Sequence, residues 1–145
     1  MRNIHHIMVA TDGSEGSSRA IDAGAEIAKA IGGTLSIVTV GTARYADEQI
    51  QFARVEGDVA DAAETFARQI LSDAEKQVQR AGIGAPKINL VWGDPAEAII
   101  DVAREEKADA IVVGRRGRGQ LSGLLLGSVS QKLATLAPCI VIVVP

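Results

Sequence analysis

Cysteine and aromatic residues are scarce in this 145-residue sequence. Cys139 is the single cysteine, so an intrachain disulfide and a cysteine-based metal site are both excluded. The two histidines, His5 and His6, are adjacent and would point to opposite sides of a strand, which argues against a paired metal site. Aromatic residues make up 3% of the chain and hydrophobic residues 47%, so the core must consist mainly of Ala, Val, Ile and Leu.

Long apolar runs and an overall basic charge are also absent. No segment approaches the roughly 20 apolar residues of a membrane-spanning helix, and the first apolar run is too short for a signal peptide. The net charge of −3 argues against a nucleic-acid-binding protein, which usually presents a basic face. We therefore expect a cytoplasmic protein without membrane or nucleic-acid partners, folded as one domain over residues 1–145.

Basic residues are concentrated near the end of the chain. The residues after Asp109 include Arg115, Arg116 and Arg118 but no acidic residue. These three arginines lie in the segment GRRGRGQLSGLLLGS, residues 114–128, together with five glycines. A local basic segment on an acidic protein indicates a small anionic ligand more than a polyanion.

Hydrophobic periodicity predicts strands that alternate with helices. Strands are expected at 4–10, 34–40, 87–92, 110–114 and 139–144, and helices at 17–31, 59–81, 95–107 and 128–136. Alternation of this kind predicts parallel strands joined by right-handed crossovers. The near-continuous apolar strands agree, because both faces of such a sheet are covered by helices. The fold is therefore predicted to be a single doubly wound α/β unit, with no assignment for residues 41–58.

Local signals refine two of the helices. Asp94 is the expected N-cap of the helix that starts at Pro95, because proline loses nothing by lacking an N–H at the first helical position. Gly24 lies on the apolar stripe of helix 17–31 and would let that helix approach the sheet closely. The expected buried stripe of helix 59–81 consists of Ala63, Phe66, Ile70, Ala74 and Val78.

The chemistry of segment 114–128 favours phosphate binding. Its glycines allow close approach of backbone N–H groups to an anion, and Gly127 and Ser128 open a helix whose N-terminus favours negative charge. Ser128 and Ser130 add hydroxyl donors, and the arginines can offset phosphate charge. The alternative is a surface loop followed by a capped helix. Neither the Walker A loop nor the dinucleotide pattern fits, because there is no Gly-Lys pair and the spacing is G-x-G-x-x-x-G.

A narrower pattern does match. Gly114-x2-Gly117-x9-Gly127-Ser128 is similar to the G-x2-G-x9-G-[ST] motif of ATP-binding universal stress proteins. The stretches MVATDGSEGS, at the end of the first strand, and GDPAEAI, after the third, also resemble that family. The resemblance spans residues 1–145 and implies a five-stranded parallel sheet in the order 3-2-1-4-5, with helices on both faces.

The resemblance also implies a binding site for ATP. Asp12 would lie near the ribose, Val40 would meet the adenine ring, and a bridging Mg²⁺ or Mn²⁺ would be held by the phosphates, since no acidic cluster looks built to hold a metal alone. We expect Arg115 and Arg116 to contribute positive charge, an inference from charge only. The complete set of expected ligand contacts is Ala10, Thr11, Asp12, Val40, Gly114, Arg115, Arg116, Gly117, Gly127, Ser128, Val129 and Ser130.

The function implied by the resemblance is nucleotide-dependent regulation in a stress response. Two alternatives stay open: a slow ATPase, for which Asp12 is the only candidate acid and no general base is evident, and a non-nucleotide dimeric scaffold. Asp12 itself has an alternative role as a turn residue or helix cap. A homodimer through Ile140–Val144 is expected, because an apolar strand at a sheet edge would otherwise stay exposed.

Overall fold

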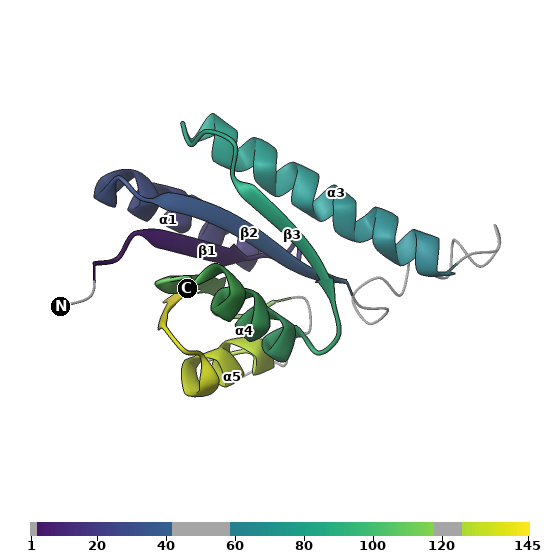
Figure 1. The fold of residues 1–145 in the computed structure, drawn as a ribbon. Helices are drawn as coiled ribbons and strands as arrows, with labels where there is room; N and C mark the ends of the chain where they lie inside the picture. Colours follow the sequence, from purple (N-terminus) through teal and green to yellow (C-terminus); the bar gives the residue numbers. More distant parts are fainter. Residues whose placement is uncertain (1–2, 42–58, 118–125) are drawn as a thin grey trace.

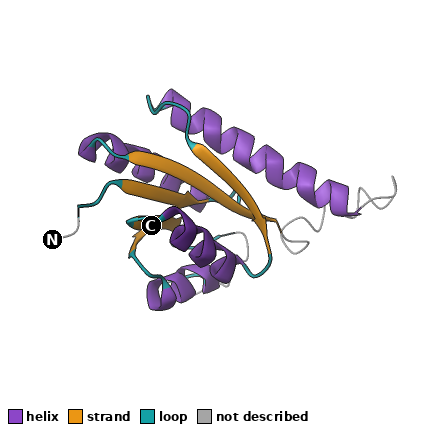
Figure 2. Cartoon of the chain, viewed as in Figure 1, coloured by secondary structure: helices purple, strands orange, loops and turns teal. Residues whose placement is uncertain are grey.

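A computed structural model of the chain describes residues 3–41, 59–117 and 126–145. Within these ranges, strands and helices alternate along the chain (Figures 1 and 2). The elements are β1 (His6–Ala10), α1 (Glu15–Ile31), β2 (Thr34–Gly41), α3 (Val59–Arg80), β3 (Lys87–Trp92), α4 (Pro95–Glu106), β4 (Ala110–Gly114), α5 (Ser128–Leu136) and β5 (Ile140–Val144). Among the described residues, no helix is long and apolar enough to cross a membrane. Most of the segment left unassigned from the sequence, 42–58, lies outside the described residues.

The five strands form one parallel sheet in the order β3-β2-β1-β4-β5, which confirms the predicted topology. β1 lies at the centre, where Val9 is opposite Ile37 of β2 and Val112 of β4. α1 and α3 cover one face of the sheet, and α4 and α5 cover the other (Figure 1). The carboxyl ends of β1 and β4 are therefore neighbours, which brings the loops that follow them together.

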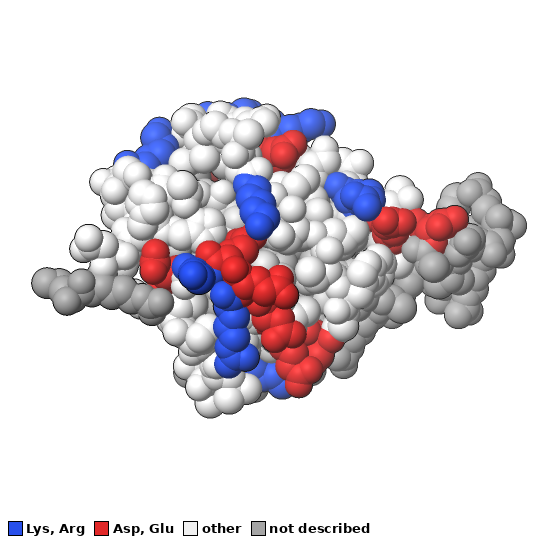
Figure 3. Space-filling model, viewed as in Figure 1, with Lys and Arg blue, Asp and Glu red and all other residues white. Residues whose placement is uncertain are grey.

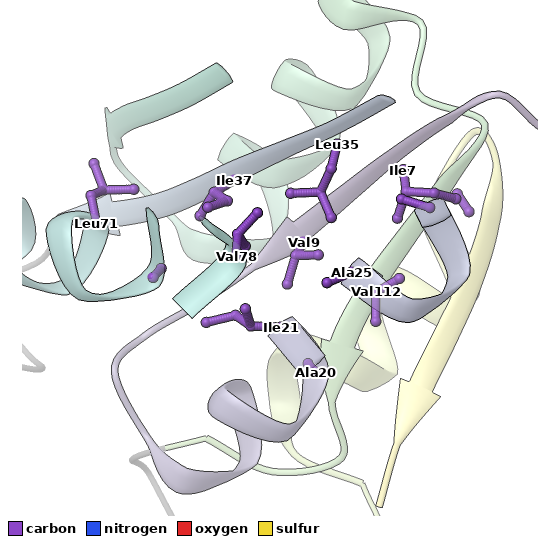
Figure 4. Packing of buried hydrophobic residues seen from close by; sticks show 13 residues of the cluster. Ile7, Val9, Ala20, Ile21, Ala25, Leu35, Ile37, Leu71, Val78 and Val112 are labelled. Atoms are coloured by element: carbon purple, nitrogen blue, oxygen red, sulfur yellow. The ribbon is translucent and has the colours of Figure 1, made fainter. Parts of the chain in front are cut away.

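Alternate residues of the central strands fill two hydrophobic clusters, one on each face. On the first face, Val9 and Val112 pack with residues of α1 and α3, and Figure 4 shows these side chains gathered between the strands and helices. On the second face, Met8 and Ile111 pack against α4 and α5. The predicted close approach of α1 is confirmed, because a Cβ atom on Gly24 would collide with the Val9 side chain.

The helix ends follow the chemistry of their capping residues. Ser14 accepts a hydrogen bond from the Ser17 N–H, so α1 begins at Glu15, two residues before the predicted start. Gly32 ends the same helix with a φ of 64°, as the sequence predicted. Asp94 caps α4 and Pro95 opens it, also as predicted.

One expectation for α3 is partly wrong. Ala63, Ala74 and Val78 are buried as predicted, whereas Phe66 and Ile70 are half-buried. Ala67 and Leu71 are buried in their place. Both choices satisfy a helical period, because residues three and four apart lie on one face. The alanine at position 67 lets the helix lie close to β2, which displaces the larger Phe66 and Ile70 to the margin of the contact.

A buried carboxylate ties together the amino ends of three strands. The side chain of Glu106 is 5% exposed and accepts hydrogen bonds from the Ser36 hydroxyl at 2.6 Å and from the Asn89 amide at 2.7 Å. His6 Nε2 lies 3.1 Å and Lys87 Nζ 3.5 Å from its carboxylate oxygens. Burial alone would raise the pKa of Glu106, but these hydrogen bonds and the Lys87 charge outweigh burial and hold the pKa below its usual value of 4.5.

The Glu106→Gln variant tests this network. A carboxyl whose pKa is lowered by folding stabilises the protein above its unfolded pKa, and that contribution is lost as pH falls through the folded pKa. We expect Glu106→Gln to lower the free energy of unfolding by about 1–3 kcal/mol at pH 7, because an amide nitrogen would face donors. The difference from the parent should shrink below about pH 4 in denaturant unfolding experiments. The matched control is Glu105→Gln, an exposed neighbour; equal effects of the two variants would contradict the assignment.

Candidate functional site

The candidate site lies where the loops after β1 and β4 meet. A Cβ atom on Gly114 would lie 2.7 Å from the Gly16 carbonyl carbon, and one on Gly16 would lie 2.6 Å from the Arg116 carbonyl oxygen. Both glycines are therefore required by backbone-to-backbone contact in the fold itself. As a result, the first turn of α1 is held directly against the glycine-rich loop.

Asp12 connects the two loops. Its Oδ1 accepts a hydrogen bond from the Ser14 N–H at 2.9 Å, and Gly13 adopts a φ of 81°, so Asp12 does have the turn role considered as an alternative. Its Oδ2 lies so near Gly117 that a Cβ atom there would collide with it. Asp12 and Gly117, which the sequence assigned to one ligand, are thus neighbours in space.

The Thr11 side chain forms hydrogen bonds with neighbouring residues of the protein. Its hydroxyl donates to Ser17 Oγ at 3.0 Å and accepts from the Gly13 N–H at 3.2 Å. Thr39, which the sequence analysis did not single out, donates its hydroxyl to the Thr11 carbonyl at 2.7 Å and is almost completely buried. The available signal for Thr39 was a polar residue near the carboxyl end of a strand rich in β-branched residues.

A shallow depression borders the carboxyl ends of β1 and β2. Its volume is about 10 Å³, which is the space of roughly one water molecule. Val40 borders it and is otherwise packed with Ala10 in the cluster on the α4 face. Among the described residues, this depression is too small to hold an aromatic ring as it stands. The full lining is Asp12, Thr39, Val40, Gly41, Ala63, Phe66, Ala67 and Ile70.

The N-terminus of α5 is anchored to the loop after β4. The Gly127 N–H donates to the Arg115 carbonyl at 2.8 Å, and the Ser130 hydroxyl donates to the carbonyls of Gly114 at 3.2 Å and Arg115 at 2.8 Å. Ser130 is buried, whereas Ser128 is exposed. The hydroxyl of Ser130 therefore holds the loop in place.

Gly127 differs from Gly114 and Gly117 because the described residues around it leave room for a side chain. A Cβ atom would lie 3.4 Å from Arg116 Cα and 3.5 Å from the Arg115 carbonyl oxygen, which are ordinary contacts. Gly127 is the N-cap of α5 and makes no side-chain capping bond, in contrast to Ser14 and Asp94 at α1 and α4. Among the described residues, none comes closer than an ordinary contact to the position of a Cβ atom at the start of α5.

The larger hollow lies elsewhere, beside the N-terminus of α1. It has a volume of about 190 Å³ and is lined by Ser14, Glu15, Gly16, Arg19, Arg115, Arg116 and Pro145. Arg115 and Arg116 therefore border this cavity and not the depression near Asp12. No group of three or more His, Cys, Asp or Glu residues suited to a metal ion occurs among the described residues.

The fold and site define an α/β protein whose ligand-binding loops would lie at the carboxyl ends of β1 and β4. Residues 3–145 match the model of the universal stress protein family. A universal stress protein of Thermus aquaticus is 34% identical over 138 residues, which cover 95% of this chain and 96% of the relative. The universal stress protein YxiE of Bacillus subtilis is 32% identical over 148 residues, covering 95% of this chain and 97% of YxiE. The chain belongs to the universal stress protein family.

Solved structures agree with this membership. A universal stress protein in complex with cAMP matches with a TM-score of 0.72 and 30% identity, covering 99% of this chain and 98% of that one. The Archaeoglobus fulgidus universal stress protein in complex with dAMP matches with a TM-score of 0.71 and 25% identity, covering 97% and 98% of the two chains. UspA from Lactobacillus plantarum has a TM-score of 0.81 at 22% identity over the full length of both chains, which shows the shared fold.

Proposed function

We propose that this chain is a cytoplasmic regulatory protein that binds ATP and changes its interactions with nucleotide occupancy during stress. The observation that carries the proposal is Gly127, a glycine that the fold does not require, at the uncapped start of α5. The two relatives described in complex with cAMP and dAMP support an adenine nucleotide as the ligand class.

The phosphates would lie at the first turn of α5. The backbone N–H groups of Ser128, Val129 and Ser130 begin the helix, and a helix N-terminus carries about half a positive charge. A side chain at Gly127 would occupy the space through which a phosphate reaches these groups. This arrangement binds phosphate through backbone geometry, without a lysine.

The adenosine would extend from this point toward β1 and β2. Gly114 and Gly117 would lie along the ribose and α-phosphate, and Asp12 would meet the ribose hydroxyls. Ala10, Thr11 and Val40 would border the adenosine at the strand ends, where the adenine ring enters the depression beside Phe66. Arg115 and Arg116 would add positive potential to the same loop.

A divalent ion would bind at this site together with the phosphates and not by itself. Mg²⁺ or Mn²⁺ would neutralise phosphate charge, held mainly by phosphate oxygens, because the described residues offer no three-ligand group. Asp12 is the carboxylate among the expected ligand contacts, and its Oδ1 already accepts from the Ser14 N–H.

Replacing Gly127 by Val tests the phosphate site. The added side chain should block phosphate approach and raise the Kd for ATP by about 100-fold or more, while the fold is retained. Isothermal titration measures binding, and denaturant unfolding checks the fold. The control is Gly84→Val, because a Cβ atom at Gly84 meets nothing within 4 Å. Should Gly127→Val bind ATP as the parent does, the phosphates lie elsewhere; Gly127→Ala provides the same test if the valine variant does not fold.

Asp12 variants test the ribose contact. Asp12→Ala should weaken adenosine and ATP by a similar factor of about ten, because the ribose is common to both. Asp12→Asn keeps an acceptor for the Ser14 N–H and controls for loss of the turn. Equal affinities of parent and Asp12→Ala for adenosine would leave Asp12 with its turn role alone.

We further propose a homodimer through β5. β5 is at the edge of the sheet and pairs with β4 alone among the described strands. Its first residue, Ile140, is 47% exposed. Light scattering at micromolar concentration should give about twice the 15.1 kDa of one chain. Ile140→Lys should shift the protein toward the monomer, because a charge on an edge opposes pairing, whereas Ile4→Lys should not. A monomeric parent protein would contradict the dimer.

A further inference from the structure

Three arginines from two separate segments line the cavity of about 190 Å³ beside α1. Arg19 comes from α1, and Arg115 and Arg116 follow β4. We refer to the hollow that they line as the arginine cavity. Its volume far exceeds the roughly 10–15 Å³ that one water molecule needs. The cavity shares no lining residue with the depression next to Asp12.

Arg19 is held in place at the wall of the cavity. Its Nε donates to the Pro145 carbonyl at 3.1 Å, which links α1 to the end of β5. Its Nη2 lies 3.9 Å from the position that a Cβ atom on Gly16 would take. A guanidinium has five N–H donors, so one bond to a carbonyl leaves further donors for a ligand.

The positive charge of the arginine cavity is not matched by its surroundings. Glu15 is the single acidic side chain in the lining. Within the described ranges, none of the three arginines forms an ion pair with an acidic side chain, whereas Arg68 pairs with Glu64 at 2.9 Å. The N-terminus of α1 adds its own partial positive charge.

One concentration of acidic side chains lies away from the arginine cavity. In Figure 3, acidic side chains form a band over α4, on the face of the sheet opposite α1. The exposed acidic residues of α4 and its cap are Asp94, Glu97, Asp101 and Glu105. A cavity lined by three arginines and one acidic side chain favours the binding of an anion.

We propose that the arginine cavity is a second anion site, which takes a phosphate group independently of the nucleotide site. The planar fork of arginine matches phosphate oxygens with paired hydrogen bonds, which favours phosphate over a spherical anion. The two sites lie on different sides of the loop after β4. The Arg116 carbonyl contacts Gly16 at α1, while the Arg115 carbonyl accepts from Gly127 at α5. The second site therefore stands whether or not α5 binds a nucleotide.

The experiment titrates inorganic phosphate into the full chain at constant ionic strength, with chemical shifts of backbone amides as the readout. We expect saturable shifts at Gly16 and Arg116, and a loss of affinity of about tenfold in Arg19→Gln. Arg104→Gln, an exposed arginine of α4, should bind phosphate as the parent does. The Gly127→Val variant should also keep phosphate binding, and Arg19→Gln should keep the parent's behaviour toward ATP.

Three results would overturn the second site. The first is no saturable shift at Gly16 with up to about 10 mM phosphate. The second is equal affinity of Arg19→Gln and the parent. The third is loss of phosphate binding in Gly127→Val, or displacement of phosphate by ATP at one ATP per phosphate in the parent protein. Either outcome would make the cavity part of the nucleotide site. Failure of ATP to bind the parent would contradict the proposed function and leave the phosphate result intact.

Discussion

The first turn of α1 lies directly on the backbone that follows β4, and this contact exists because Gly16 and Gly114 lack side chains. The contact sets the distance between the loops after β1 and β4. Gly127 and Ser130 then attach α5 to the same loop through the Arg115 carbonyl. Two helix N-termini are in this way directed toward one strand end, where their dipoles favour anions. Any ligand in this region must use donors that are already positioned.

The charge around the loop after β4 differs from the overall charge of the chain. The chain is acidic overall, and exposed carboxylates crowd α4 (Figure 3). Charges separated by more than about 10 Å are largely screened at 0.1 M salt, so the local field at the loop after β4 depends mainly on nearby groups: Arg19, Arg115 and Arg116, the two helix ends, and the carboxylates of Asp12 and Glu15. A protein of net charge −3 can therefore present sites for anions.

The sequence predicted the elements well because their signals are local. Asp94 and Pro95 define the start of α4, and Gly32 defines the end of α1. The order of the strands came from the family resemblance. The spacing of the motif gives Gly114 and Gly127 the same standing. In the structure, the contact with Gly16 requires a glycine at position 114, whereas the described residues leave room for a side chain at position 127. The requirement for glycine at position 114 depends on a contact between residues about 100 positions apart along the chain. The same separation applies to Arg19 and Arg116, which line one cavity.

The central claim is that the loop after β4 and the N-terminus of α5 bind an adenine nucleotide. The most direct measurement is to denature the purified protein and identify any released nucleotide by ion-exchange chromatography. We expect the released nucleotide to be ATP, at nearly one molecule per chain. If the released nucleotide is mostly ADP, the same site hydrolyses ATP slowly. A protein that releases no nucleotide and does not bind added ATP with magnesium would contradict the claim and favour a dimeric scaffold.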